Sequence, residues 1–356
     1  MRQKILVIGP CLAMGGMERA SANTANGLSQ KSEVVFVSLF KKPHFFQLNP
    51  GIHLEEPDNF NSSSLSLFKT VKWIRKLVKT HKPDSVLVFN KFYSALTAFA
   101  LIGNSVPFFI SERSSPLYVW KQPFRLINWL AFTLRAPQGV IAQTSIAAQY
   151  QRKYYKKSKV KVIPNIVREV QLFPAIPREK FILAVGRFND ALKGFDRLLE
   201  AIAITKTDWP LYLAGGENRS DPKLDTLIET CALKERIHFL GKVTDMDPLF
   251  ARAGLFVIPS RSEGFPNALV EAMAAGLPCI SFDFVAGPQD IIEDGINGIL
   301  VPDGNIQKLA DAIDRLILDE NLQIQLGKNA LAARENYKAE TITKEIEQFI
   351  LSNINE

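Results

Sequence analysis

Two glutamates, Glu263 and Glu271, stand with seven residues between them around the turn formed by residues 264–266. The turn follows an apolar run at residues 255–259, which we expect to be a buried strand, and it precedes a helical pattern with Asn267 as its expected N-cap. A helix N-terminus offers free backbone N–H groups and a partial positive charge, which suit a phosphate. Because carboxylates beside a phosphate would be repelled, we expect them to accept hydrogen bonds from sugar hydroxyls. This is the outline of a nucleotide-sugar site.

Two cations follow another strand-like run at residues 181–186. Arg187 comes directly after it, and Lys193 precedes Gly194 at the start of a helical pattern. Ligands of doubly wound sheets bind beyond the carboxyl ends of the strands, so both cations are expected at the binding edge. A planar guanidinium and a compact ammonium suit a diphosphate leaving group. Two solvated loop cations are the alternative.

The loop after the first expected strand contains Gly15 and Gly16 in front of a helical pattern at residues 17–29. It lacks the G-x-G-x-x-G spacing of dinucleotide-binding folds. Adjacent glycines still allow the backbone to approach an anion or a sugar closely. A flexible turn would have the same sequence.

Apolar runs alternate with helical patterns along the whole chain. This alternation predicts parallel sheets with helical crossovers, and therefore two doubly wound α/β domains. Because ligands bind beyond the carboxyl ends of such strands, the site is expected in a cleft between the two domains. Strands are expected at residues 4–9, 34–39, 85–89, 107–111, 139–143, 160–164, 181–186, 210–214, 237–240, 255–259, 278–282 and 298–301.

The expected domains are residues 1–170 and 171–340, joined by a linker within residues 166–180 that contains two prolines. A chain of 356 residues is long enough for two such domains. A last helix over residues 337–351, mostly within the C-terminal segment 341–356, follows the second sheet. The sequence leaves open whether this helix returns to the first domain.

Composition indicates a globular protein, with 47% hydrophobic and 22% charged residues. No stretch approaches the eighteen or so apolar residues of a membrane span, and the apolar start is too short for a signal peptide. The three cysteines are scattered, which fits a reducing cytoplasm.

The net charge of +7 conceals an asymmetry between the two halves. Residues 1–170 carry 24 Lys and Arg against 8 Asp and Glu, a net of +16, whereas the remainder carries 19 against 28, a net of −9. A basic first half is expected to meet an anionic surface or substrate. The basic residues form no recognised nucleic-acid module, so nucleic acid is not an expected partner.

These motifs together resemble the family-4 retaining glycosyltransferases, which have the GT-B fold of two Rossmann-like α/β domains. The resemblance covers nearly the whole chain, and its most specific part is the block from Glu263 to Glu271. It rests on residues 15–19, 162–165, 186–187 with 193–194, 238–241, and 263–271.

The resemblance implies a role for each of these residues. Glu271 would accept hydrogen bonds from the ribose, and Glu263 would hold the donor sugar beside the backbone N–H groups of the following turn. Arg187 and Lys193 would neutralise the departing diphosphate, and Gly16 would approach it from the first domain. The implied catalytic residues are Glu263, Arg187 and Lys193, and the implied donor-binding residues are Gly15, Gly16, Arg187, Lys193, Glu263, Gly264, Phe265, Pro266, Asn267 and Glu271.

One departure from the family concerns the acceptor side. Many relatives carry a histidine after the strand expected at residues 107–111, where this chain has Glu112 and Arg113. A histidine base is therefore excluded there, which is compatible with front-face attack in which a donor phosphate oxygen takes the acceptor proton. Glu112 and Arg113 either orient the acceptor or form a structural ion pair.

The triplet Asp245-Met246-Asp247 could hold a metal–diphosphate in another glycosyltransferase fold. Here it precedes a helical pattern, so Asp247 is expected to be an N-cap. Because Arg187 and Lys193 supply positive charge, we expect neither a metal nor another cofactor.

Residues 116–135 mix aromatic side chains, Tyr118 and Trp120 among them, with cations, and residues 150–159 do so again. This composition suits a helix lying on anionic lipid, although core aromatics with a solvated basic rim would look similar. We therefore expect a peripheral enzyme at the inner face of the cytoplasmic membrane. It would transfer a hexose or N-acetylhexosamine, with UDP preferred on family frequency, to a polyprenyl-diphosphate-linked saccharide of a surface polysaccharide or glycan. A nucleotide-sugar epimerase or hydrolase and a non-catalytic relative are the alternatives.

Overall fold

A computed structural model describes residues 2–61, 66–117, 121–216, 222–285 and 287–354. The chain divides into two compact units, which are described separately. Unit 1 comprises Met1–Ile166 with Ala339–Glu356, and unit 2 comprises Val167–Lys338. The divisions expected after residues 170 and 340 lie four and two residues beyond the divisions in the structure, which follow Ile166 and Lys338.

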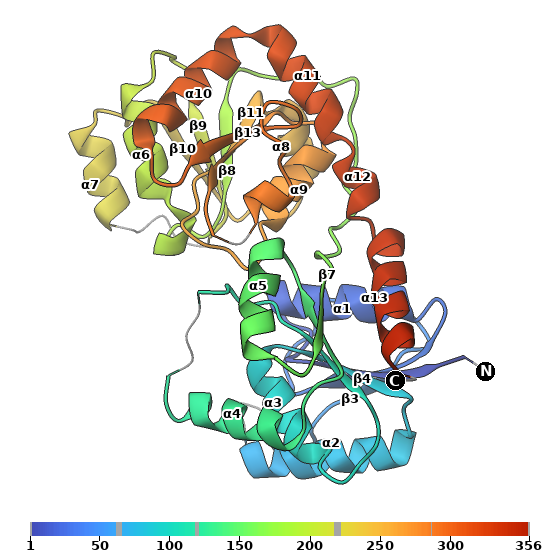
Figure 1. Cartoon of the computed structure of the whole chain (residues 1–356). Helices are drawn as coiled ribbons and strands as arrows, with labels where there is room; N and C mark the ends of the chain where they lie inside the picture. The colour runs from blue at the N-terminus through green and yellow to red at the C-terminus, as the bar shows by residue number, and fades with distance from the viewer. Residues whose placement is uncertain (1, 62–65, 118–120, 217–221, 286, 355–356) are drawn as a thin grey trace. The chain divides into compact units, whose positions relative to one another are not determined.

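Unit 1 is built on a parallel sheet flanked by helices (Figure 1). Its described strands lie in the order β3-β2-β1-β4-β5-β6-β7. Every strand pairs in parallel with its neighbours. Such strands are buried on both faces, which explains their near-continuous apolar sequences. The strands are β1 (Lys4–Gly9), β2 (Glu33–Ser38), β3 (His53–Glu55), β4 (Ser85–Phe89), β5 (Phe108–Ser111), β6 (Gly139–Ala142) and β7 (Lys159–Val162).

Alternate residues of these strands enter two different cores. Ile5 and Val7 of β1 pack in one core with residues of α1 (Gly16–Leu28) and of the final helix α13 (Ala339–Ile354). Leu6 and Ile8 pack in the other core, with residues from the helices on the opposite face. Those helices are α2 (Leu67–His81), α3 (Lys91–Ala100) and α4 (Phe124–Leu134).

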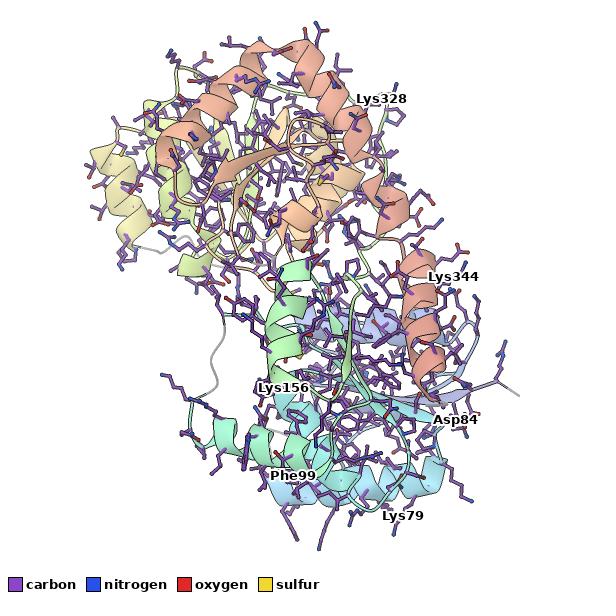
Figure 2. The ribbon with its side chains drawn as sticks, viewed as in Figure 1. Lys79, Asp84, Phe99, Lys156, Lys328 and Lys344 are labelled. Carbon is purple, nitrogen blue, oxygen red and sulfur yellow. The ribbon has the colours of Figure 1, made fainter. Side chains whose placement is uncertain are left out.

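Helix α13 belongs to unit 1, which answers the question that the sequence left open. Gly27 of α1 faces Thr343, and the rings of Phe109 and Phe349 meet edge to face at 5.9 Å between centroids. Helix α5 (Ser145–Tyr154) follows β6. Side chains such as Lys79 on α2 and Lys156 beyond α5 project from the surface of this basic unit (Figure 2).

Unit 2 contains a second parallel sheet, whose described residues give the order β10-β9-β8-β11-β12-β13. Its strands are β8 (Ile182–Val185), β9 (Leu211–Ala214), β10 (Ile237–Gly241), β11 (Leu255–Ile258), β12 (Cys279–Asp283) and β13 (Ile299–Pro302). Its helices are α6 (Phe195–Ile204), α7 (Pro222–Thr230), α8 (Asp247–Arg252), α9 (Asn267–Ala274), α10 (Ile306–Leu318), α11 (Glu320–Ala330) and α12 (Ala333–Asn336). None of the described helices of either unit has the length and apolar character needed to cross a membrane.

Candidate active site

The loop after β8 and the loop after β11 meet at the carboxyl edge of the unit 2 sheet. Gly194 connects a short 3-10 turn to α6 with φ of +69°, a left-handed conformation. A Cβ atom at this position would lie 2.0 Å from the carbonyl oxygen of Pro259 at the end of β11. Both the conformation and the close approach require glycine. The Arg261 N–H also donates to the Leu192 carbonyl at 2.8 Å, which ties the two loops together.

Lys193 and Glu263 form an ion pair where these loops meet. The ammonium lies 2.7 and 2.9 Å from the two carboxylate oxygens, and the Ser260 hydroxyl donates to Oε1 at 2.8 Å. Both side chains are largely buried, at 21% and 14% exposed. An ammonium has three N–H donors, so Lys193 can hold Glu263 and still donate to a phosphate oxygen.

Arg187 lies at the exposed rim of the same edge. Its side chain is 72% exposed and pairs with Asp190 at 2.7 Å. A second ion pair, which sequence reasoning missed, stiffens the loops: Arg261 binds Asp196 through two bonds of 2.7 and 2.5 Å. These hydrogen bonds hold the pKa of Asp196 below its ordinary value, although burial opposes them.

The turn before α9 departs from the expectation in one respect. Pro266 is the N-cap and Asn267 is the first helical residue, so the prediction of Asn267 as the N-cap was wrong. The Asn267 N–H donates to the Phe265 carbonyl at 2.9 Å, which commits a donor that was expected to face a ligand. Phe265, which follows Gly264 in this turn, is buried against the ring of Tyr337 and anchors the turn.

Glu271 is buried on α9, at 7% exposed, and is not the solvated helix carboxylate that would be its alternative. Its Oε2 accepts a hydrogen bond from Nε of Arg168 at 3.2 Å. Another guanidinium nitrogen of Arg168 donates to Asp247, which is 8% exposed. The Gln171 N–H donates to the other oxygen of Asp247 at 2.8 Å.

The arginine thus connects two buried carboxylates from different helices. Asp247 is not an N-cap, as was predicted, because α8 has Met246 in that place. Burial raises the pKa of Asp247, but the hydrogen bonds from Arg168 and Gln171 outweigh it, so the pKa lies below its ordinary value. Burial lowers the pKa of Arg168, but the two carboxylates outweigh burial, so the pKa of Arg168 lies above its ordinary value.

In unit 1, Gly15 and Gly16 stand at the N-terminus of α1, with Gly15 as the N-cap. A Cβ atom on Gly16 would meet no atom within 4 Å. A Cβ on Gly15 would approach only the carboxylate end of the flexible Glu18 side chain. The helix start is therefore open on the Gly16 side, as a ligand-binding turn requires.

Glu112 and Arg113, at the carboxyl end of β5, are both buried but have different partners. The Glu112 carboxylate accepts the backbone N–H groups of Arg113 and Ser114, each at 3.1 Å, and burial raises its pKa despite these bonds. Arg113 donates to the Ser111 hydroxyl at 2.8 Å and to the Asn165 side chain. Burial lowers the pKa of Arg113 to about 10. The hydrogen bond of Arg113 to Asn165 holds the loop that follows β7.

Lys91 is a further cation at this edge that sequence reasoning missed. It is the first residue of α3, after the N-cap Asn90, whose φ is +78°. Its ammonium lies 3.1 Å from the ring centre of Tyr154, and no described residue forms a hydrogen bond or ion pair with it. Burial lowers the pKa of Lys91 to about 8, against the charge of Glu112. The only sequence signal was its place two residues after the end of β4.

Each of the two units matches a known protein family. The family described as Glycosyltransferase Family 4 matches residues 14–169, and the family described as Glycosyl transferases group 1 matches residues 168–333. The fold is GT-B: the HepE protein of Anabaena in complex with UDP has a TM-score of 0.83 at 21% identity, over 98% of this chain and 100% of that one. The chain belongs to the family-4 glycosyltransferases and is a glycosyltransferase.

Two full-length relatives are bacterial glycosyltransferases. An uncharacterised glycosyltransferase of Haemophilus influenzae is 26% identical, over 93% of this chain and 95% of its own length. An α-1,4-N-acetyl-D-galactosaminyltransferase of Campylobacter jejuni is 25% identical, over 96% of both chains. The second is named for its acceptor, GalNAc-α-(1→4)-GalNAc-α-(1→3)-diNAcBac-PP-undecaprenol.

Proposed function

We propose that this glycosyltransferase moves a hexose or N-acetylhexosamine from a UDP-sugar to a polyprenyl-diphosphate-linked saccharide, with retention of configuration. The observation that carries the donor half is the Lys193–Glu263 ion pair at the carboxyl ends of β8 and β11. A carboxylate and an ammonium held together suit a donor with sugar hydroxyls next to a diphosphate.

Four charged residues of unit 2 have roles in this proposal. Glu263 accepts hydrogen bonds from the donor sugar, and Glu271 accepts them from the ribose. Arg187 and Lys193 stabilise the negative charge that grows on the departing diphosphate. Their charge makes a metal ion unnecessary for the transfer.

The reaction follows a front-face course. The acceptor oxygen bonds to the anomeric carbon as the bond from that carbon to the diphosphate oxygen breaks, and the acceptor proton passes to an oxygen of the leaving diphosphate. This route needs no histidine at the position of Glu112. In unit 1, Gly16 leaves room for the donor phosphate, and Glu112, Arg113 and Lys91 stand at the sheet edge where an acceptor is expected.

Helix α4 supports a lipid-linked acceptor and a membrane surface. Its buried residues are Asn128 and Ala131, whereas its exposed residues are mainly large and apolar, with Trp129 at 60% exposed. A helix that turns its apolar stripe outward and carries Arg125 beside it suits an anionic lipid surface. The exposed apolar residues of α4 are Phe124, Leu126, Trp129, Leu130 and Leu134. Tyr118 and Trp120, which the sequence grouped with this helix, lie outside the described residues.

The chemistry is tested by incubating the purified protein with a panel of UDP- and GDP-sugars, with and without a polyprenyl-diphosphate saccharide. We expect nucleotide release only with the acceptor, together with a glycolipid product whose new bond has the anomeric configuration of the donor. Release without acceptor would instead indicate a hydrolase, and an isomerised donor would indicate an epimerase.

Flotation with anionic liposomes at low salt tests the membrane surface. We expect the wild type to float with the liposomes, and the double variant Leu126→Ser/Trp129→Ser to stay in the bottom fraction of the gradient. Leu318→Ser is the matched control, because Leu318 is 83% exposed on α10 of unit 2. Equal flotation of the α4 variant and the wild type would contradict the role of α4.

A further inference from the structure

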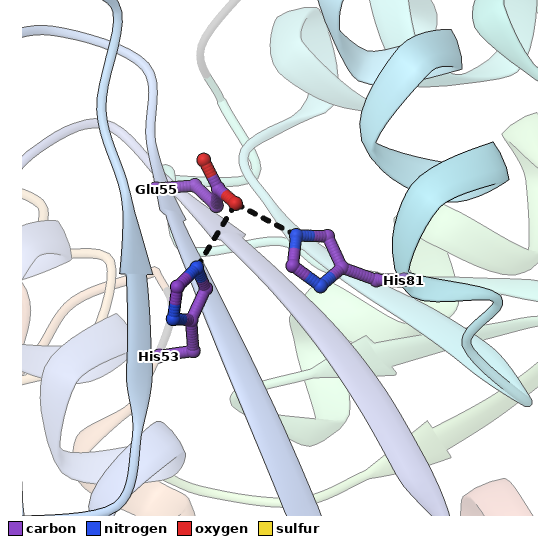
Figure 3. A group of neighbouring side chains, drawn as sticks. All are labelled: His53, Glu55 and His81. Carbon is purple, nitrogen blue, oxygen red and sulfur yellow. Dashed lines mark hydrogen bonds and ion pairs between the residues drawn. The ribbon is translucent and has the colours of Figure 1, made fainter.

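We propose that His53, Glu55 and His81 of unit 1 form a binding site for a divalent transition metal, with Zn²⁺ the best-suited ion. The Nε2 atoms of His53 and His81 lie 3.0 and 2.7 Å from the same oxygen, Oε1 of Glu55 (Figure 3). One ligand atom from each of the three residues can be chosen so that all lie within 4.8 Å of one another. Two imidazoles thus converge on one carboxylate.

The fold itself brings these side chains together. β3 pairs in parallel with β2, so that His53 stands beside Val35 and Glu55 beside Val37. Val35 and Val37 face the core that contains α2, whereas Leu54 packs in the core on the opposite face. His53 and Glu55 therefore point to the α2 side of the sheet, because strand side chains alternate.

His81 completes the group as the last residue of α2. Its side chain is 16% exposed, that of Glu55 is 25% exposed and that of His53 is 61% exposed. The partly buried His81 and Glu55 provide a fixed half of the site, and the exposed His53 can rotate to complete it. This combination resembles a preformed site with one adjustable ligand.

The donor set determines which metal fits. Two imidazole nitrogens and one carboxylate oxygen suit Zn²⁺, and also Ni²⁺, Co²⁺ and Cu²⁺, while a single carboxylate is a poor site for Mg²⁺ or Ca²⁺. Tetrahedral zinc ligands stand about 3.4 Å apart, given bonds of about 2.0–2.1 Å. The nitrogen–oxygen distances of 3.0 and 2.7 Å need to open by about 0.4 and about 0.7 Å to reach this separation. Each ring proton moves to Nδ1 when Nε2 binds the metal.

The position of the site predicts a structural role. His53 begins β3 and His81 precedes β4, so both lie toward the amino-terminal edge of the parallel sheet. Ligands of such sheets bind at the opposite, carboxyl edge. A metal held here would fasten the short edge strand β3 to the end of α2 and stabilise unit 1 without entering the reaction.

Titration of the metal-free full-length protein, without a histidine tag, tests the site. With Co²⁺ as the probe, we expect one tight equivalent and visible absorption bands of a low-symmetry site with imidazole ligands. Added Zn²⁺ should displace the Co²⁺ and raise the melting temperature.

The variants decide whether the named residues are the ligands. We expect His53→Ala and His81→Gln to lose the tight equivalent and the thermal shift. His44→Ala should keep both, because His44 pairs with Glu56 at 3.0 Å outside the cluster. The three cysteines are present in every variant, so thiols cannot account for a difference.

His53 is exposed, so His53→Ala keeps the test valid even if His81→Gln fails to fold. Full retention of the tight equivalent in His53→Ala, or its absence from the wild type, would overturn the proposal. The glycosyltransfer assay is independent of this outcome, because none of the three residues has a role in the proposed transfer.

Discussion

Replacing Arg168 with methionine removes one cation from two buried carboxylates, Asp247 and Glu271. Breaking a buried ion pair from one side costs about 3–5 kcal/mol, because the remaining charge is left uncompensated. The Arg168 side chain is 32% exposed, so solvent screening reduces the expected loss to about 2 kcal/mol. For a domain of this size, that is a fall in melting temperature of about 4–8 °C.

Urea unfolding at neutral pH measures this loss, and the triple variant Arg168→Met/Asp247→Asn/Glu271→Gln is the control. With no charge left to compensate, the triple variant should regain most of the stability. A loss below about 0.5 kcal/mol for the single variant, the level of ordinary surface changes, would refute the reasoning.

Acid provides a second readout for the same variant. The pKa of Asp247 is depressed in the folded protein, so its contribution is present above the ordinary Asp range and is lost as the pH falls through the folded pKa. The stability difference between wild type and Arg168→Met should therefore shrink below about pH 4. A difference that stays constant down to strongly acidic pH would show that the ion pair is not its source.

Lys91→Met should raise the free energy of unfolding at pH 7 by about 1–3 kcal/mol, because burial disfavours the charge of Lys91 more strongly than the nearby Glu112 favours it, and no described residue forms a hydrogen bond or ion pair with the ammonium. The folded pKa of about 8 lies below the ordinary 10.5, so the stability of the wild type should rise as the pH increases between these values. The stability of the variant should not rise in the same way. An equal dependence of stability on pH in the two proteins would contradict this reasoning. Gly194→Ala should lose about 2 kcal/mol or more and most of the transfer activity, because of its left-handed φ and the contact with Pro259. Gly16→Asp should fold with unchanged melting temperature but transfer poorly, because its side chain has room and would repel a donor phosphate; wild-type kinetics would remove Gly16 from the donor site. A chelator should leave the rate of transfer unchanged, whereas an essential metal would make the rate fall.

The strands of both sheets could be predicted to within a residue or two. Parallel strands buried on both faces form continuous apolar runs, and Leu255–Ile258 is one example. β3 was missed because an edge strand of three residues with His53 and Glu55 on one face has no such run. The predicted N-cap at Asn267 failed because local preference favoured asparagine, whereas the turn geometry placed Pro266 there.

The site could be predicted only in part. Lys193 and Glu263 could be selected because each lies in the loop after a recognisable strand, at the edge where ligands of such sheets bind. Their ion pair was not predicted, because the two residues are 70 positions apart in the chain. Arg168 could not be found in this way, since its partner Glu271 lies 103 residues away and only the folded chain brings the two together. Lys91 was missed because its burial beside the Tyr154 ring is a property of the packing, which the sequence does not show.

In the proposed mechanism, Lys193 and Glu271 act on a nucleotide-sugar donor. The most direct test of these roles is the rate of acceptor-dependent nucleotide release by Lys193→Ala and Glu271→Ala, with circular dichroism to verify the fold. Arg252→Ala is the control, because Arg252 pairs with the exposed Glu179 away from the site. We predict folded Lys193 and Glu271 variants that have lost transfer, beside an active control. Transfer at the wild-type rate by either folded variant would contradict the site assignment.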